Sequence, residues 1–320
     1  MYRWCTNEVE PNDRFDYWRE VRAKGLFGVT AELEREHRAG FYGEFSLSQV
    51  GNGGLVELKA SSYAVERSLT DISRAPGDSI CVYQQLGGGG WFGGMRTSDF
   101  AIANGAFATS HTDLPYRTKP LGDAGFHLRI LKIPVSGLST QEKRTRELAP
   151  KVFNDPTLAP LLDACFAELD ETASQDGSHD AAPLVQALGH LALIERGIVR
   201  PGSRRGQAAL RTARLSLARR LIARNLQDPN LAPSGVADLL GVSVRHLHML
   251  FEVAERSFSQ TVTEERLKQS RQLMREAPDR LIADIASACG FESLATYYRV
   301  FNAAYGMAPG DFRAQAAGVR

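Results

Sequence analysis

Histidine and cysteine side chains can bind metals or act as nucleophiles, and their spacing in this sequence favours neither chemistry. His246 and His248 are two residues apart on an expected helix, so they point to different faces and cannot bind one ion together. His111 and His127 lie in a region that reads as strands, where cupin-type enzymes hold a metal, but the HxH pattern and the later Glu are missing. The four cysteines form no CxxC pair, and no GxSxG or GxxxxGK[ST] motif occurs. We therefore expect no metal, no cofactor and no enzyme activity.

Arginine is distributed in a way that indicates a different chemistry, the binding of a polyanion. The net charge is only +1, but residues 196–320 hold 19 Lys and Arg against 11 Asp and Glu, and 18 of those 19 are Arg. Residues 1–195 hold 19 Lys and Arg against 26 Asp and Glu. Since guanidinium groups pair well with phosphates and base edges, this asymmetry favours an acidic domain joined to a nucleic-acid-binding domain.

The basic part of the chain contains an internal repeat. Ala237, Gly241 and Val242 recur 49 residues later as Ala286, Gly290 and Phe291, and Ser243, Leu247 and Phe251 recur 50 residues later as Ser293, Tyr297 and Phe301. The Gly allows the left-handed backbone of a tight turn, and the Ser can cap the helix that follows it. The repeat predicts two helix-turn-helix motifs, one over about residues 234–255 and the other over about 282–305.

Helical spacing assigns the side chains of each second helix to two faces. One face is an apolar stripe, which packs on the core, and the other is polar. In such motifs the second helix enters the major groove of DNA and its N-terminal residues contact the bases. The candidates for base contacts are Arg245, His248, Thr296 and Arg299. The candidates for backbone contacts are Ser243, Ser293, Arg266, Lys268 and Arg271.

These motifs resemble the AraC/XylS family of transcriptional regulators over Leu217–Arg313. The strongest match is in the second repeat: Ile282-x3-Ala286-x3-Gly290-Phe291, Tyr297-x-Arg299-x-Phe301 and Gly306-x2-Pro309-x2-Phe312-Arg313. The N-terminal part is similar to the XylS-like sensor domain at Phe15-x2-Trp18, Pro76-Gly77-Asp78 and Leu131-x2-Pro134. Three positions depart from the family: Met249 replaces its usual Arg, Ala295 its usual Ser, and Ala308 its usual Ser or Thr. The loss of an Arg at Met249 predicts weaker base reading by the first motif.

The elements that position these residues predict an α+β protein. Short segments rich in β-branched and aromatic residues, Leu55–Ala60, Ser79–Leu86 and Phe126–Pro134, alternate with glycine clusters and predict a β-barrel or cupin-like domain. Apolar residues at helical spacing begin after about residue 136. The predicted domains are 1–199 for effector binding or dimerisation (strands over 1–138, helices over 139–199), a linker over 200–212, and an all-helical DNA-binding domain over 213–320.

The widely spaced cysteines favour a reducing, cytoplasmic setting. The resemblance implies an activator that binds promoter DNA, contacts RNA polymerase and responds to a small-molecule effector. The alternative is a cupin-like metalloenzyme domain fused to a DNA-binding tail. Candidates for lining an effector pocket are Tyr83, Trp91, Phe92, Phe107, His111 and Tyr116. A homodimer is expected, and the Leu184, Leu188 and Leu191 stripe of the helix Ala181–Arg196 is either its interface or packs on its own barrel. No run of 18 apolar residues occurs, so we expect no membrane span.

Overall fold

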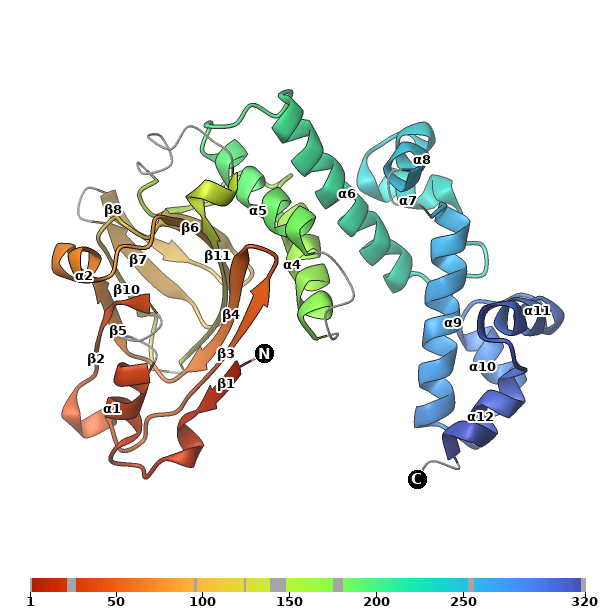
Figure 1. Ribbon diagram of the computed structural model, residues 1–320, viewed down its shortest axis with the longest axis horizontal. Coiled ribbons are helices and arrows are strands. Elements are labelled where there is room, and N and C mark those ends of the chain that lie inside the picture. Colours follow the sequence, from red (N-terminus) through yellow and green to blue (C-terminus); the bar gives the residue numbers. More distant parts are fainter. Residues whose placement is uncertain are drawn as a thin grey trace. The chain divides into compact units, whose positions relative to one another are not determined.

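The computed structural model describes residues 2–21, 27–94, 97–123, 125–138, 148–174, 181–252 and 256–317 (Figure 1). The chain divides into two compact units, Met1–Ala213 and Arg214–Arg320. In the described ranges, no helix combines the length and the apolar composition that crossing a membrane requires.

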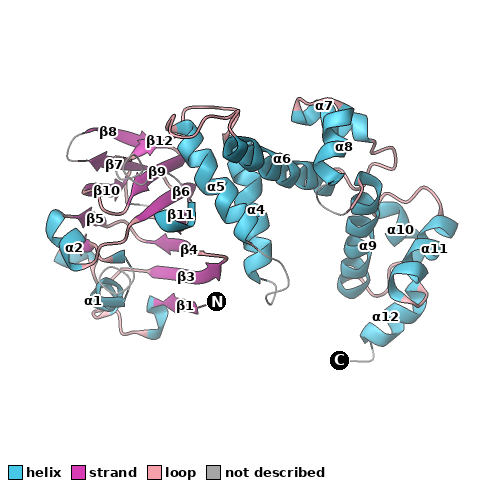
Figure 2. Cartoon of the chain, turned by 45° about the horizontal axis from the view of Figure 1, so that its top comes forward, coloured by secondary structure: helices cyan, strands magenta, loops and turns pink. Residues whose placement is uncertain are grey.

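The first unit contains two antiparallel sheets within its described residues (Figure 2). The larger sheet has seven strands in the order β1 (Tyr2–Cys5), β3 (Gly43–Val50), β4 (Gly53–Ala60), β11 (Phe126–Pro134), β6 (Ser79–Gly87), β9 (Phe107–His111) and β12 (Lys151–Val152). The smaller sheet has five, in the order β2 (Thr30–Glu32), β5 (Ala64–Arg67), β10 (Tyr116–Pro120), β7 (Gly90–Gly94) and β8 (Thr97–Ile102). The three strands predicted from composition are β4, β6 and β11, and they are confirmed.

The expected closed barrel is corrected to two facing sheets. Among the described residues, no ladder of hydrogen bonds joins the edge strands of one sheet to those of the other. Buried side chains from both sheets pack together between them: Phe92 of β7 and Ile102 of β8 contact Ala108 of β9. The α+β class is confirmed. Periodicity in the sequence predicts strands, but it does not determine whether the outermost strands pair, because that depends on strand tilt and stagger.

Aromatic rings fill the end of the first unit near its N-terminus. The helix α1 (Arg14–Trp18) inserts Phe15 and Trp18 against Phe41, Phe45 and Tyr63, and the ring centroids of Trp18 and Phe45 are 5.5 Å apart.

The described residues of this unit also form short helices. The 3-10 helices are η1 (Thr6–Glu8), η3 (Arg35–His37) and η4 (Val135–Leu138). The short helix α2 (Leu69–Arg74) begins with a capping box formed by Ser68 and Asp71.

The helices α4 (Ala159–Ser174) and α5 (Ala182–Glu195) lie on the outer face of the larger sheet (Figure 2). Leu184, Leu188 and Leu191 of α5 are all buried within the first unit. Of the two roles expected for this stripe, packing on its own sheet is therefore the one observed. Polar contacts reinforce the packing of α4, since Gln84 of β6 donates to Asp163 at 2.8 Å and Arg129 of β11 pairs with Asp170.

The residues expected to form the linker are mostly helical. After the turn at Pro201–Ser203, the helix α6 (Arg204–Arg224) begins, and the Ser203 hydroxyl accepts a hydrogen bond from the Gly206 N–H at 3.2 Å. The polar residues that indicated an irregular segment are thus a helix cap and the hydrophilic first turn of the helix that follows it. The units divide at Ala213 and Arg214, inside this helix.

The described part of the second unit is helical. It comprises the end of α6, then α7 (Pro233–Leu240), α8 (Val244–Glu252), α9 (Phe258–Glu276), α10 (Ile282–Ala288), α11 (Leu294–Tyr305) and α12 (Pro309–Ala317). Two apolar clusters form its core. One surrounds Leu247 and Phe251 of α8, and the other surrounds Tyr297 and Phe301 of α11. The long helix α9 contributes to both clusters and so joins the two helix pairs (Figure 1).

Candidate nucleic-acid interface and ligand cavity

The first helix-turn-helix motif is formed by α7 and α8, within the range expected for it; residues 253–255 of that range lie outside the described residues. Gly241 ends α7 in the left-handed region at φ +64°. The Ser243 hydroxyl then accepts a hydrogen bond from the His246 N–H at 3.2 Å, at the start of α8. Leu247 and Phe251 are buried, whereas Arg245 and His248 are exposed. The apolar and polar faces expected from helical spacing are confirmed for these residues, but Val244, which the spacing placed on the apolar face, is 40% exposed.

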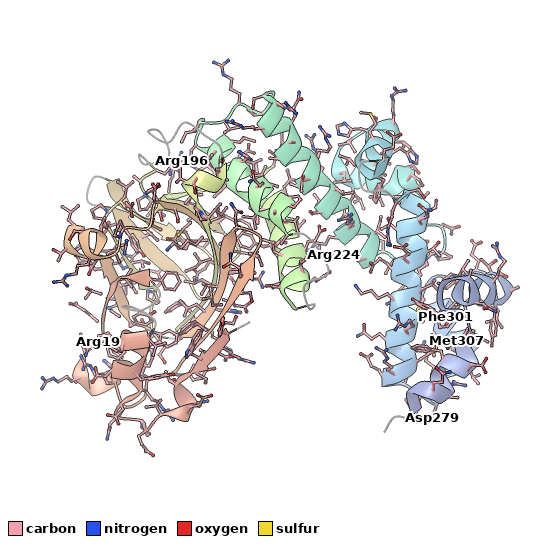
Figure 3. The ribbon with its side chains drawn as sticks, in the orientation of Figure 1. Arg19, Arg196, Arg224, Asp279, Phe301 and Met307 are labelled. Carbon is pink, nitrogen blue, oxygen red and sulfur yellow. The ribbon has the colours of Figure 1, made fainter. Side chains whose placement is uncertain are left out.

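The second motif repeats this arrangement in α10 and α11. Gly290 has φ +81°, and the Ser293 hydroxyl accepts a hydrogen bond from the Thr296 N–H at 3.4 Å. Tyr297 and Phe301 are buried in the second cluster, and Phe301 is labelled in Figure 3. Thr296 and Arg299 are exposed. The four candidates for base contacts are therefore all accessible on the second helices of the two motifs, where a DNA groove could reach them.

Arg266 makes contacts inside the protein that the sequence did not predict. Its Nε donates to the carbonyl oxygen of Leu226 at 3.1 Å, and its Nη2 donates to that of Asp228 at 2.6 Å. Its guanidinium also lies 5.9 Å from the ring centroid of Phe291, and burial lowers its pKa. These contacts connect α9 with the end of α6 and with the turn of the second motif.

Arg271 is likewise engaged internally. Its guanidinium lies 4.7 Å from the ring centroid of Tyr305 and 5.1 Å from that of Phe312, in cation–π contacts that fix α12 against α9 and α11. Lys268 is exposed, with its Nζ 3.9 Å from a carboxylate oxygen of Glu265. Of the three basic residues expected to contact phosphates from α9, Lys268 is exposed, whereas Arg266 and Arg271 are partly buried and make these internal contacts. Sequence spacing could not reveal this, because all three lie on one helix and differ only in what packs beside them.

A cavity of about 170 Å³ lies between the two sheets of the first unit. Tyr83, Phe92 and Tyr116, three of the six residues expected in an effector pocket, line it. Trp91 precedes Phe92 on β7 and does not line it. Phe107 instead packs on Phe153 and Phe166, 6.3 Å and 6.0 Å away between ring centroids.

His111 is the remaining pocket candidate, and it too lies outside the cavity lining. It is buried, and its Nδ1 accepts a hydrogen bond from the Asp113 N–H at 3.1 Å. His127 contacts Glu57, with 2.7 Å between Nε2 and Oε1. In the described ranges, ligand atoms suited to a metal converge at Glu34, Glu36 and His37, which are all exposed. The metalloenzyme alternative therefore gains no support from the placement of His111 or His127.

Lys132 is a cavity residue that the sequence analysis missed. It lies on β11 two residues after Ile130 and four after Leu128, and all three line the cavity. Strand alternation was the available signal, because residues at i, i+2 and i+4 share a face of a strand. Once Leu128 and Ile130 are placed on the inner face, Lys132 must lie on it too.

Comparison with known proteins supports the interpretation of the second unit. A family model described as a helix-turn-helix domain matches residues 236–315. The chain is 29% identical over 103 residues to the transcriptional activator NphR of Rhodococcus sp., a match that covers 32% of this chain and 30% of the relative. The similarity thus spans less than a third of that curated relative.

Two solved structures are similar to this chain, and the first of them informs on the fold. The AraC-like transcriptional activator CuxR has a TM-score of 0.53 and 21% identity, covering 90% of this chain and 99% of that chain. A transcriptional regulator with an AraC-type DNA-binding domain from Chromobacterium violaceum is 31% identical, covering 34% of this chain and 96% of its own, with a TM-score of 0.32. The likeness to CuxR shows that both units follow one known fold. Together with the repeated motif, these findings show that residues 236–315 form a helix-turn-helix domain, that this part of the chain is similar to a transcriptional activator, and that the chain shares its fold with an AraC-like one.

Proposed function

We propose that this protein is a transcriptional activator that binds promoter DNA through both motifs and performs no catalysis. The proposal rests on one observation: two helices of the same unit, each capped by a Ser, expose polar side chains at equivalent positions. Arg245 and His248 project from α8, and Thr296 and Arg299 project from α11, each opposite a buried apolar stripe. A guanidinium can donate two hydrogen bonds to guanine, and an N-terminal Ser brings free N–H groups to a phosphate.

Selection from a random pool of double-stranded DNA with the full chain tests this proposal. We expect a recurrent sequence with two protected patches whose centres are about 10–10.5 base pairs apart, one turn of B-DNA. The logarithm of affinity should fall linearly with the logarithm of salt concentration, because phosphate contacts release counterions. The double variant Arg245→Ala/Arg299→Ala should lose the sequence preference, whereas Lys59→Met, an exposed change in the first unit, should keep it. A pool that shows no enrichment would contradict the proposal.

The proposal also includes three further partners: RNA polymerase, a second copy of the chain and a small-molecule effector. NphR is named an activator, and by analogy we propose that this protein raises transcription through contact with RNA polymerase. We also propose that it acts as a homodimer and that a small molecule bound in the first unit shifts the population of DNA-binding arrangements. Sedimentation analysis tests the dimer. Because the leucine stripe of α5 is buried within its own unit, a dimer would have to use another surface.

A further inference from the structure

Exposed apolar side chains are concentrated on the two helices that carry the candidate base contacts. Within the described part of the chain, nine large apolar side chains are exposed, and four of them lie on α8 and α11: Val244, Met249, Leu294 and Tyr298. An exposed apolar residue that stands alone is ordinary, but several that gather on one face mark a surface that a partner covers. The question is which partner covers these four.

The internal repeat places two of these side chains at equivalent positions. Val244 and Leu294 are 50 residues apart, and each is the first residue of its helix, directly after the Ser that caps it. Leu294 is 45% exposed. In a helix-turn-helix motif the first residues of the second helix come nearest to the base edges. Both motifs therefore present a branched apolar side chain at the end of the helix that enters the groove.

Met249 adds a third apolar side chain to the exposed face of α8. It follows Arg245 by four residues, so the two side chains are neighbours on the helix surface. Among the described residues, neither apolar cluster of the second unit includes Val244, Met249 or Leu294. Tyr298 differs from these three, because its ring packs edge-on against that of Tyr297, 6.1 Å away between centroids, and its hydroxyl can hydrogen-bond.

The charge around these side chains favours DNA as the partner that covers them. Residues 196–320 hold 19 Lys and Arg against 11 Asp and Glu, which suits a polyanion better than an apolar protein groove. In the major groove every base pair presents hydrogen-bonding groups, and thymine adds an apolar one, its 5-methyl group. Valine and leucine side chains have no donor or acceptor, and a thioether is only a weak acceptor. The 5-methyl group is therefore the part of the groove that they can bind.

We propose that Val244, Met249 and Leu294 select thymine through its 5-methyl group, so that A·T pairs lie beneath the first turn of both second helices. Contact between a methyl group and an aliphatic side chain removes apolar surface of both from water. This inference rests on the proposed function and adds to it the bases that the apolar side chains prefer. Two of the three side chains belong to α8, so the first motif reads mainly by apolar contact.

Replacement of thymine by uracil in the selected DNA sequence tests the proposal, because uracil lacks only the 5-methyl group and keeps every hydrogen-bonding group. One thymine is replaced at a time, and the affinity of the full chain is measured by fluorescence anisotropy. We expect about fourfold weaker binding at one or more positions in each of the two protected patches, the effect of losing one buried methyl group. Uracil outside the patches should leave the affinity unchanged.

Variants of the protein assign each methyl group to a side chain. Leu294→Ala should abolish the difference between thymine and uracil in one patch, and Val244→Ala or Met249→Ala should abolish it in the other. Met249→Leu keeps an apolar side chain of similar size and should retain the difference. Leu239→Ala is the matched control, because Leu239 is 63% exposed but lies on α7, the first helix of its motif. It should bind every DNA as the wild type does.

The outcomes separate this inference from the proposed function. Equal affinity for thymine and uracil at every position, in a protein that still selects a DNA sequence, would overturn the inference alone. A preference for thymine that persists in Val244→Ala, Met249→Ala and Leu294→Ala would also overturn it, because other side chains would then contact the methyl groups. A pool of DNA that shows no enrichment would overturn the proposed function, and the inference with it.

Discussion

The two helix-turn-helix motifs have the same local design but differ in what surrounds their turns. Gly241 and Gly290 both adopt positive φ, at +64° and +81°. A Cβ at Gly241 would meet no atom within 4 Å. A Cβ at Gly290 would collide with the Leu226 carbonyl oxygen and lie 3.0 Å from Arg266 Nε. The first turn thus needs Gly only for its backbone conformation, whereas the second also needs it for tertiary packing.

Their exposed faces differ as well. The first motif presents Met249, which is 52% exposed, in the family position of an Arg. The second presents Arg299, which is exposed and can donate to a base. The second motif is therefore more tightly connected to the rest of its unit, and we propose that it also reads the DNA sequence more strongly.

The largest difference in stability between the two motifs should appear when the Gly in each turn is replaced by Ala. Gly290→Ala should lower the free energy of unfolding by about 2–5 kcal/mol, because left-handed strain adds to a clash with backbone. Gly241→Ala should cost about 1–2 kcal/mol from strain alone. Urea unfolding followed by far-UV circular dichroism measures both. The three Trp residues all lie in the first unit, so their fluorescence transition is the internal control. Equal losses of unfolding free energy for the two variants would contradict the claim that only the second turn needs Gly for tertiary packing.

Arg266→Met tests the connection that only the second motif has. Loss of the hydrogen bonds to the Leu226 and Asp228 carbonyls should destabilise the second unit by about 2–3 kcal/mol, since a charged donor is removed and two carbonyls lose a partner. Lys268→Met, an exposed change on the same helix, should alter stability by less than about 0.5 kcal/mol. If Arg266→Met instead leaves stability unchanged but reduces the salt dependence of DNA binding, Arg266 is a phosphate contact after all.

The difference in base reading predicts unequal losses of DNA discrimination. Arg299→Ala should cost about 1–3 kcal/mol on the selected sequence and much less on scrambled DNA. Met249→Ala should change discrimination far less, because a thioether offers only apolar contact. Titrations of both variants on both DNAs at two salt concentrations provide the comparison. Equal losses on the two DNAs for Arg299→Ala would show that Arg299 holds a phosphate.

The smallest expected change in stability comes from the two Ser caps, and it should be the same in both motifs. Ser243→Ala and Ser293→Ala should each cost about 1 kcal/mol of stability, because each hydroxyl satisfies one N–H at the start of its helix. Replacement by Gly should cost only a few tenths of a kcal/mol at both positions. Unfolding midpoints of the four variants measure this. A cost at Ser293 several times that at Ser243 would mean that this cap, like its turn, is tied to tertiary packing.

The helix-turn-helix motifs were predictable from sequence because their signals are local. A Gly with positive φ, a Ser three residues before the N–H it caps, and apolar residues on one helical face all act within a few residues. For the same reason the strands β4, β6 and β11 and the α+β class could be predicted from composition and turns. The exposure of Arg245, His248, Thr296 and Arg299 follows from the same periodicity.

The tertiary structure alone decided which side chains meet. In β6 both faces are largely buried, by the second sheet on one side and by α4 and α5 on the other, so no polar alternation marks the cavity face. Sequence could therefore not separate Tyr83, which lines the cavity, from Phe107, which packs under the helices. Nor could it show that Arg266 and Arg271 make contacts inside the protein, because a long, flexible, charged side chain takes its contacts from neighbours distant in the chain.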